Sequence, residues 1–295
     1  MTEFDRKPRP RRTIVPLSGA LSCAIVISMA ACGDDDTTDP DLNTDSTIVP
    51  VTGEWYRPVV TTTWQWQLLG TINTEYAVDL YDIDLFDTPA TLIASLQGAG
   101  KRVICYFSAG SFEDFRPDAA SFRSQDLGNP LDDFPNERWL DIRSPIVLAI
   151  METRLNIAVD KGCDGVEPDN MDGFTNNTGF SLTSADQLAF NRTIANEAHE
   201  RGLSVGLKND LDQIVDLIAF FDFQVNEQCH EFDECAALDP FITAGKPVFN
   251  VEYELRLVSD AATRAQLCEA ARARNFRTLI LPFDLDDSFR FSCEL

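Results

Sequence analysis

The sequence predicts a single (β/α)8 barrel over residues 55–295, and two observations support that prediction. From Trp55 onward, short apolar runs alternate with helical runs, and about eight such units follow one another, as in a barrel of ~250 residues. Polar residues fall where the apolar runs end, which is where barrel strands open into their loops. A doubly wound sheet is the alternative, but the one glycine-rich candidate turn, Gly98–Lys101, precedes a strand instead of following one.

Glycine and proline mark the ends of the predicted elements. Gly98 and Gly100 end a helix, Pro145 begins a helix that Gly162 ends, and Gly202 and Gly245 end two more. A long loop with three prolines separates the third strand from residue 145. We expect a central strand leading into residues 164–173, further strands at residues 59–67, 77–86, 102–107, 203–207, 221–225, 247–251 and 278–283, and helices at residues 89–97, 145–161, 183–201, 211–219, 234–244 and 260–274.

Residues 1–31 have the pattern of an export signal. Five basic residues between Arg6 and Arg12 precede an apolar run from Ile14 to Ala31. Small residues immediately before Cys32 resemble a bacterial lipobox, so we expect Cys32 to be lipidated and to become the mature N-terminus. Residues 32–54 then form a polar, flexible linker. The sequence predicts an exported lipoprotein anchored to the cell envelope, with plain secretion as the alternative.

The formal net charge is −24. Such an excess of acids repels phosphates, so we expect neither nucleic acid nor an anionic membrane surface as a partner. It suits a cationic partner, or it keeps an exported protein soluble. We expect a monomer whose contact with a membrane is made only through the lipid anchor.

Six cysteines remain after the leader, and an exported domain permits disulfides. Cys229 and Cys235 can close one loop, Cys268 can reach Cys293, and Cys105 and Cys163 lie on neighbouring predicted strands. Six cysteines allow fifteen connectivities, so the sequence leaves the pairing open. The chain has no CxxC pair and two histidines, of which His199 is predicted on a helix surface. We therefore expect neither a metal nor a cofactor.

Acids end most of the predicted strands, and they are densest in the stretch from Asp164 to Gly173. A surface acidic turn or calcium loop is the alternative for that stretch, but the spacing of an EF-hand is missing. Strand ends of a barrel meet at one mouth, where paired carboxylates and aromatic side chains suit glycoside hydrolysis. The residues at these ends are Gln65 or Gln67, Asp82 or Asp84, Ser108, Asp169, Lys208 with Asn209, Glu227, Glu252 and Asp284, flanked by Trp64, Trp66, Tyr106 and Tyr253.

Four runs, at residues 105–110, 165–170, 206–210 and 225–229, resemble glycoside hydrolase family 114, a family of endo-α-1,4-polygalactosaminidases with a (β/α)8 barrel. The resemblance implies that Asp169 is the nucleophile of a retaining reaction and that Glu227 is the acid/base. It implies a galactosamine-containing polymer, cationic or partly acetylated, as substrate. A non-catalytic polysaccharide-binding barrel and a glycosidase for another sugar are the alternatives. The side chains expected to bind sugar are Trp64, Asp82, Tyr106, Glu167, Lys208, Asn209 and Glu252.

Overall fold

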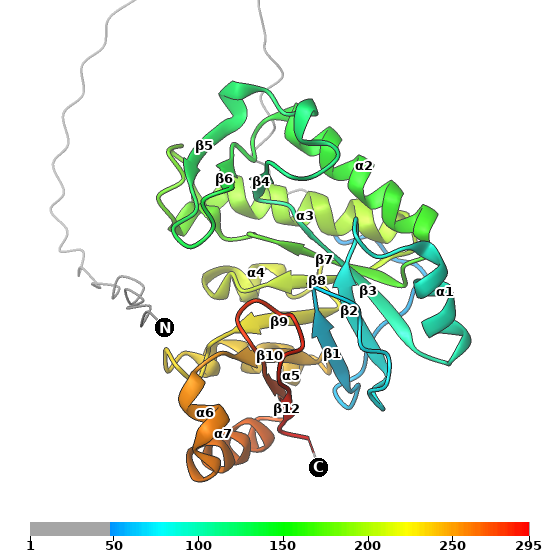
Figure 1. Ribbon diagram of the computed structural model, residues 1–295. Coiled ribbons are helices and arrows are strands. Elements are labelled where there is room, and N and C mark those ends of the chain that lie inside the picture. The colour runs from blue at the N-terminus through cyan, green and yellow to red at the C-terminus, as the bar shows by residue number, and fades with distance from the viewer. Residues whose placement is uncertain (1–47, 295) are drawn as a thin grey trace, which may run out of the picture. The chain divides into compact units, whose positions relative to one another are not determined.

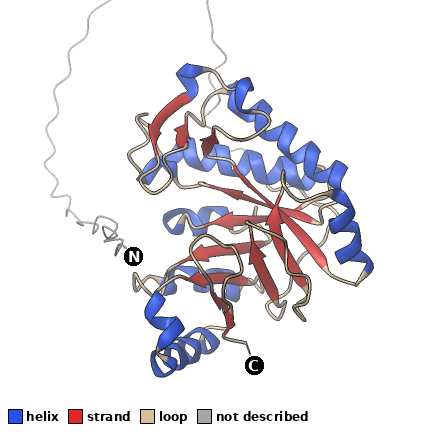
Figure 2. Cartoon of the chain, viewed as in Figure 1, coloured by secondary structure: helices blue, strands red, loops and turns tan. Residues whose placement is uncertain are grey.

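A computed structural model describes residues 48–294, and its centre is a curled sheet (Figures 1 and 2). Eight strands pair in parallel in chain order, and β12 adds an antiparallel edge to β11. The predicted signal segment and Cys32 lie outside the described residues. The strands are β1 (Trp64–Gln67), β2 (Leu80–Asp84), β3 (Arg102–Ser108), β7 (Gly165–Asp169), β8 (Ser204–Lys208), β9 (Phe223–Glu227), β10 (Val248–Glu252), β11 (Arg277–Ile280) and β12 (Phe291–Ser292).

Among the described residues, no strand pairing joins the two ends of the curled sheet. Instead, the Trp64 indole donates a hydrogen bond to the Arg277 carbonyl (2.8 Å), and Arg290 donates to the Trp64 carbonyl (3.0 Å). The backbone N–H of Leu68 also donates to the carbonyl of Leu285 (3.0 Å). The strand order and curl agree with the predicted barrel, but the ends of the sheet are joined by these bonds.

Helices flank the sheet, and the two long ones lie side by side in Figure 1. A Thr183–Asp186 capping box begins α3, and Gly162, in a left-handed conformation (φ 83°), ends α2. Among residues 48–294, no helix is long and apolar enough to cross a bilayer. The helices are α1 (Ala90–Gly98), α2 (Pro145–Lys161), α3 (Ser184–Glu200), α4 (Ile214–Leu217), α5 (Asp239–Thr243), α6 (Leu255–Ser259) and α7 (Ala261–Ala273).

The predicted long loop before residue 145 holds a second, antiparallel sheet, which is drawn in green in Figure 1. Its order is β4 (Ser111–Glu113), β6 (Glu137–Leu140) and β5 (Leu127–Pro130). The loop prediction was wrong because these strands have three or four residues each and show too little alternation to be recognised.

Side chains of the parallel strands alternate between two cores. Val103 and Cys105 of β3 face the helices, whereas Ile104 between them faces the inside of the curled sheet with Trp64 and Phe249. The same alternation continues toward the carboxyl ends of the strands. It therefore decides which of the predicted site residues enter the interior.

Three disulfides join Cys105 to Cys163, Cys229 to Cys235 and Cys268 to Cys293. These are the three pairs that strand adjacency and loop length favoured, among the connectivities that the sequence left open. The Cys105–Cys163 bond links β3 to the segment that enters β7, so it ties down the strand that carries Asp169.

Ordered contacts begin earlier in the chain than the predicted linker boundary at residue 54. The Val51 N–H donates to the side-chain oxygen of Asn196 on α3 (3.0 Å), whose amide donates to the Val49 carbonyl (2.9 Å). Residues from about 48 onward therefore pack against the folded domain.

Candidate active site

Lys208, the last residue of β8, lies at the centre of the carboxylate cluster. Its ammonium is 3.1 Å from Glu167, 3.2 Å from Asp169 and 3.6 Å from Glu227, and its side chain is 2% exposed. It also lies 4.6 Å from the centre of the Trp66 ring. Burial alone lowers the pKa of Lys208, but the surrounding carboxylates raise it well above its usual value. Lys208 is therefore a fixed positive charge.

Asp169 ends β7 at the rim of the site, and its side chain is 20% exposed. The Tyr106 hydroxyl donates to one carboxylate oxygen (3.1 Å), and the Asn170 N–H donates to the other (2.6 Å). Asn170 has a left-handed backbone (φ 59°). These contacts fix the direction in which the carboxylate points.

Glu227 ends β9, and its side chain is 24% exposed. The Tyr253 hydroxyl donates to one oxygen of Glu227 (2.7 Å), and the Asn209 amide donates to the other (3.2 Å). Asn209 also accepts the backbone N–H of Glu227 (3.0 Å), and its own backbone is left-handed (φ 47°). Asn209 thus holds Glu227 at two points.

The oxygens of Asp169 and Glu227 that contact Lys208 are at most about 7 Å apart, because both lie within ion-pair distance of one nitrogen. Carboxyl groups in retaining glycosidases are separated by ~5–5.5 Å, and those in inverting enzymes by ~6.5–9.5 Å. The upper limit on this one pair of oxygens is compatible with the spacing of a retaining enzyme.

Asp82 and Glu167 lie in the interior, where the structure differs from the expectation that they bind sugar. They are 1% and 0% exposed, beneath the rim. Neither oxygen of Asp82 meets a hydrogen-bond donor from another described residue. Burial and the charge of Glu167 raise the pKa of Asp82 well above its usual value, and burial raises the pKa of Glu167 to about 7. Glu167 contacts the Lys208 ammonium (3.1 Å), so this buried carboxyl group lies against the lysine and not on the surface of the site.

Trp64 and Glu252 were also expected to bind sugar, but the structure buries both side chains completely. Trp64 is fully buried near the start of its strand and stacks on Phe249 with ring centres 4.9 Å apart. Glu252 is fully buried and accepts the backbone N–H groups of His230 (2.9 Å) and Glu231 (3.3 Å). Glu252 thus holds the loop that follows Glu227. Tyr253, one residue later, is the side chain that reaches the site.

Glu137 is a site residue that the sequence analysis did not identify. It begins β6 in the small antiparallel sheet and accepts a hydrogen bond from the Ser111 hydroxyl (2.7 Å). The amide of Asn170 donates to the same hydroxyl oxygen (3.2 Å), which connects Glu137 to the residue after Asp169. The residue lay inside the predicted loop, where no strand end marked it.

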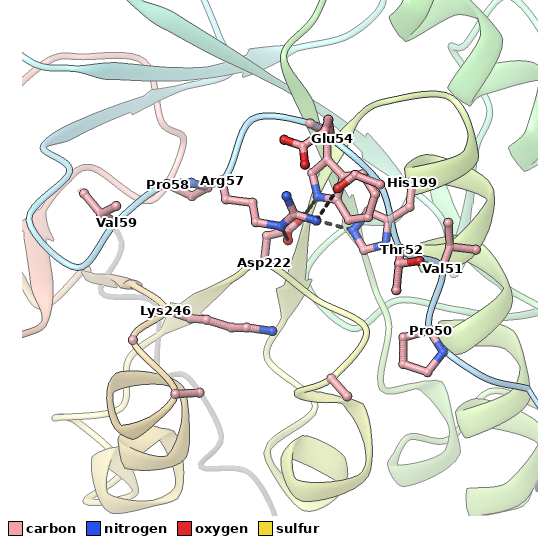
Figure 3. Close-up of a pocket in the computed structure, with 15 residues that line it drawn as sticks. Pro50, Val51, Thr52, Glu54, Arg57, Pro58, Val59, His199, Asp222 and Lys246 are labelled. Atoms are coloured by element: carbon pink, nitrogen blue, oxygen red, sulfur yellow. Dashed lines mark hydrogen bonds and ion pairs between the residues drawn. The ribbon is translucent and has the colours of Figure 1, made fainter.

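A cavity of about 720 Å³ lies at the other end of the sheet (Figure 3). Its lining includes residues 50–55 and 57–59 and positions that precede β9 and β10, such as Asp222 and Lys246. Asp222 accepts hydrogen bonds from the indole of Trp55 (3.0 Å) and shares one with His199 (2.9 Å). His199 is therefore buried and paired, not a surface residue as predicted. The cavity is separate from the carboxylate cluster, because it lies at the strand starts.

One grouping of metal-type ligands occurs among the described residues. Ligand atoms of Cys229, His230 and Cys235 lie within 4.8 Å of one another. Both sulfurs are joined in a disulfide, so neither offers a thiolate to an ion.

The fold and the site define the class of protein: a curled parallel sheet with two rim carboxylates over a buried lysine has the architecture of a glycoside hydrolase. The sequence profile of glycoside-hydrolase family GH114 matches residues 45–295. The chain belongs to that family and is a glycoside hydrolase.

Solved structures that are similar to the chain include an Aspergillus fumigatus and a Pseudomonas aeruginosa protein, whereas no curated protein sequence matches it. The complex of Aspergillus fumigatus Ega3 with galactosamine is 44% identical, with a TM-score of 0.79, and the match covers 83% of this chain and 99% of that one. The glycoside hydrolase domain of PelA from Pseudomonas aeruginosa is 15% identical, with a TM-score of 0.61 and coverage of 77% and 96%. The PelA domain shares the fold.

Proposed function

We propose that the protein is an endo-acting, retaining glycosidase that cleaves α-1,4-linked galactosamine polymers, with Asp169 as nucleophile and Glu227 as acid/base. The observation that supports this most strongly is the placement of both rim carboxylates within 4 Å of the Lys208 ammonium. The similarity to the Ega3–galactosamine complex supports an amino-sugar substrate.

In the proposed reaction, a carboxylate oxygen of Asp169 attacks the anomeric carbon while the protonated Glu227 gives its proton to the leaving glycosidic oxygen. The glycosidic bond breaks and a glycosyl ester forms on Asp169. Glu227, now ionised, takes a proton from the water that attacks this ester, which releases the sugar and restores both groups. Lys208 and Tyr106 stabilise the negative charge of Asp169 when no glycosyl ester is attached to it.

Incubation with a panel of glycans tests this function. We expect oligosaccharides to be released from de-N-acetylated α-1,4-galactosamine polymer, and NMR of the first products to show the α anomer. An initial β product would establish inversion. Tight binding of the polymer with no cleavage after long incubation would show a binding protein instead.

Phe134 is expected to help hold the polymer. It is 44% exposed at the turn between β5 and β6, and its ring stacks on Phe283 at 5.8 Å. Phe283 in turn packs edge-on against Tyr253 at 5.5 Å, so an aromatic run leads from Glu227 outward. We expect Phe134→Ala to lower kcat/KM on long polymer by about 3- to 10-fold, the value of one aromatic contact.

Comparing chain lengths tests that role of Phe134. A short substrate that does not reach the turn should be cleaved at the wild-type rate. Phe134→Tyr keeps the ring and should retain activity. Equal losses on long and short substrates would show that Phe134 supports the fold of the site and does not bind the chain.

We also propose that the protein is exported as a lipoprotein modified at Cys32, with a disulfide-bonded catalytic domain. The three disulfides support an oxidising location. Labelled fatty acid should enter the wild-type protein in a bacterial host and not the Cys32→Ser variant. Label retained in that variant would contradict the assignment.

A further inference from the structure

A row of buried polar side chains crosses neighbouring strands of the curled sheet and ends at Glu227. Its members are Thr278 on β11, Asn250 on β10, Asn226 on β9 and Asn209 just after β8, and we call these four residues the polar ladder. The strand register places Asn250 beside Thr278 on one side and beside Asn226 on the other. Adjacent strands lie about 4.8 Å apart, so side chains in register meet across the sheet.

The hydrogen bonds along the polar ladder all run in one direction. The Thr278 hydroxyl donates to the side-chain oxygen of Asn250 (2.9 Å), and the Asn250 amide donates to the oxygen of Asn226 (3.0 Å). The Asn226 amide donates to the oxygen of Asn209 (3.2 Å), and the Asn209 amide donates to the Glu227 carboxylate (3.2 Å). Each amide thus accepts at its oxygen and donates from its nitrogen, which satisfies both groups in a buried site.

Two neighbouring backbone groups set this direction. The backbone N–H of Glu227 can only donate, and it donates to the side-chain oxygen of Asn209 (3.0 Å). Farther along the ladder, the Asn250 amide also donates to the Glu252 oxygen that accepts the His230 backbone N–H (3.2 and 2.9 Å). Turning over an amide would set donor against donor or acceptor against acceptor. The Asn209 nitrogen is therefore directed at Glu227.

The strand residues of the polar ladder face away from the carboxylate cluster. Val225, Phe249 and Leu279, which adjoin them on the three strands, pack in the core inside the curled sheet. Because successive strand residues face opposite sides, the ladder residues on these strands face the outer side, where they are 0% exposed. Their effect on the reaction therefore passes through Asn209 and Glu227.

We propose that Thr278, Asn250 and Asn226 are positioning residues for acid/base catalysis. They hold the Asn209 amide, and through it the Glu227 carboxyl group, where the proton can be given to the glycosidic oxygen. The inference rests on the role of Glu227 in the proposed function and adds three residues that do not face the substrate. Misplacing a catalytic group by about 1 Å can cost about 10²-fold in rate, so a network that fixes one carboxyl oxygen acts on catalysis.

The test compares a substrate that needs the acid with one that does not. Wild type, Asn226→Leu and Thr278→Val are assayed on α-1,4-galactosamine polymer, whose leaving sugar must be protonated, and on an aryl glycoside of a galactosamine oligomer, whose phenolate leaves without that help. We expect Asn226→Leu to lower kcat on polymer about 10- to 100-fold and Thr278→Val about 3- to 10-fold, with KM unchanged. The rate of the phenol burst should stay within about twofold of wild type in both variants.

Two further variants serve as controls. Thr278→Ser keeps the hydroxyl and should restore the polymer rate to within about twofold of wild type. Thr62→Val removes another buried hydroxyl, which accepts the Val59 backbone N–H (3.0 Å) in the turn before β1, at the start of that strand. It should lower Tm about as much as Thr278→Val and leave both substrates within about twofold of wild type.

The outcomes separate this inference from the proposed function. Wild type that releases neither oligosaccharides nor phenol would refute both. With active wild type, equal losses on polymer and aryl glycoside would show that the polar ladder only supports the fold, and full polymer activity would show that Asn209 holds Glu227 unaided. Either result would overturn this inference alone. If Asn226→Leu does not fold, the isosteric Thr278→Val decides by the same comparison.

Discussion

Asp169→Asn and Glu227→Gln should each lower oligosaccharide release by about 10³-fold or more while the protein stays folded. Asparagine cannot form the glycosyl ester, and glutamine cannot give or take the proton. Both replacements keep the size of the side chain, and both residues lie on the partly exposed rim, so little packing is lost. Circular dichroism and thermal unfolding should therefore match those of the wild type.

The two variants should differ in how they respond to substrate and to added nucleophile. An aryl glycoside needs little acid help, so Glu227→Gln should still form the glycosyl ester and show a burst of phenol. Azide should then release a product of retained configuration from Glu227→Gln and of inverted configuration from Asp169→Asn. The opposite pattern would exchange the two roles.

A matched acid provides the control. Asp284 follows β11 and was counted among the strand-end acids, but its side chain is exposed. Asp284→Asn should keep at least about half of the wild-type activity, because an exposed charge contributes little. Full activity in Asp169→Asn or Glu227→Gln would remove that residue from the mechanism.

The sequence located the ends of three central strands correctly because strong local signals mark them, whereas the strand predicted at residues 278–283 ends at Ile280. Pro145 and Gly162 bound α2 as predicted, and the runs that end in Asp169, Lys208 and Glu227 are strands β7, β8 and β9. Once parallel strands are assigned, their carboxyl ends must share one edge. Asp169, Lys208, Asn209, Glu227 and Tyr106 are brought together for that reason.

Depth and register were harder to predict from the sequence. Successive strand residues face opposite sides, so a shift of one position exchanges Glu252 for Tyr253 at the site. Residues two positions apart on a strand face the same side but lie at different depths. Asp169 lies at the rim, whereas Glu167 on the same strand lies in the interior. Composition cannot distinguish these cases, because a buried acid is tolerated only through a partner elsewhere in the chain, here Lys208.

Lys208→Met should be both inactive and destabilised. Lys208 is the one lysine or arginine among the described residues within 4 Å of Glu167, Asp169 or Glu227. Its removal leaves those carboxylates beside one another in a buried site, and breaking a buried pair costs about 3–5 kcal/mol. Thermal unfolding at neutral pH should show a lower Tm. The kcat should fall because Asp169 and Glu227 lose the positive charge that both of them contact.

The pH dependence of this loss identifies its cause. Without Lys208 the carboxyl pKa values of the folded variant rise above their unfolded values, so the folded form binds protons more tightly. Stability of Lys208→Met should therefore increase as the pH falls from about 7 toward 5, while the wild type, whose Lys208 pKa is raised, keeps the contribution of this lysine throughout. Lys208→Met combined with Glu167→Gln removes one buried charge and should recover part of the Tm but none of the activity. A Tm deficit that is the same at every pH would show that lost packing, not unpaired charge, is what the substitution introduces.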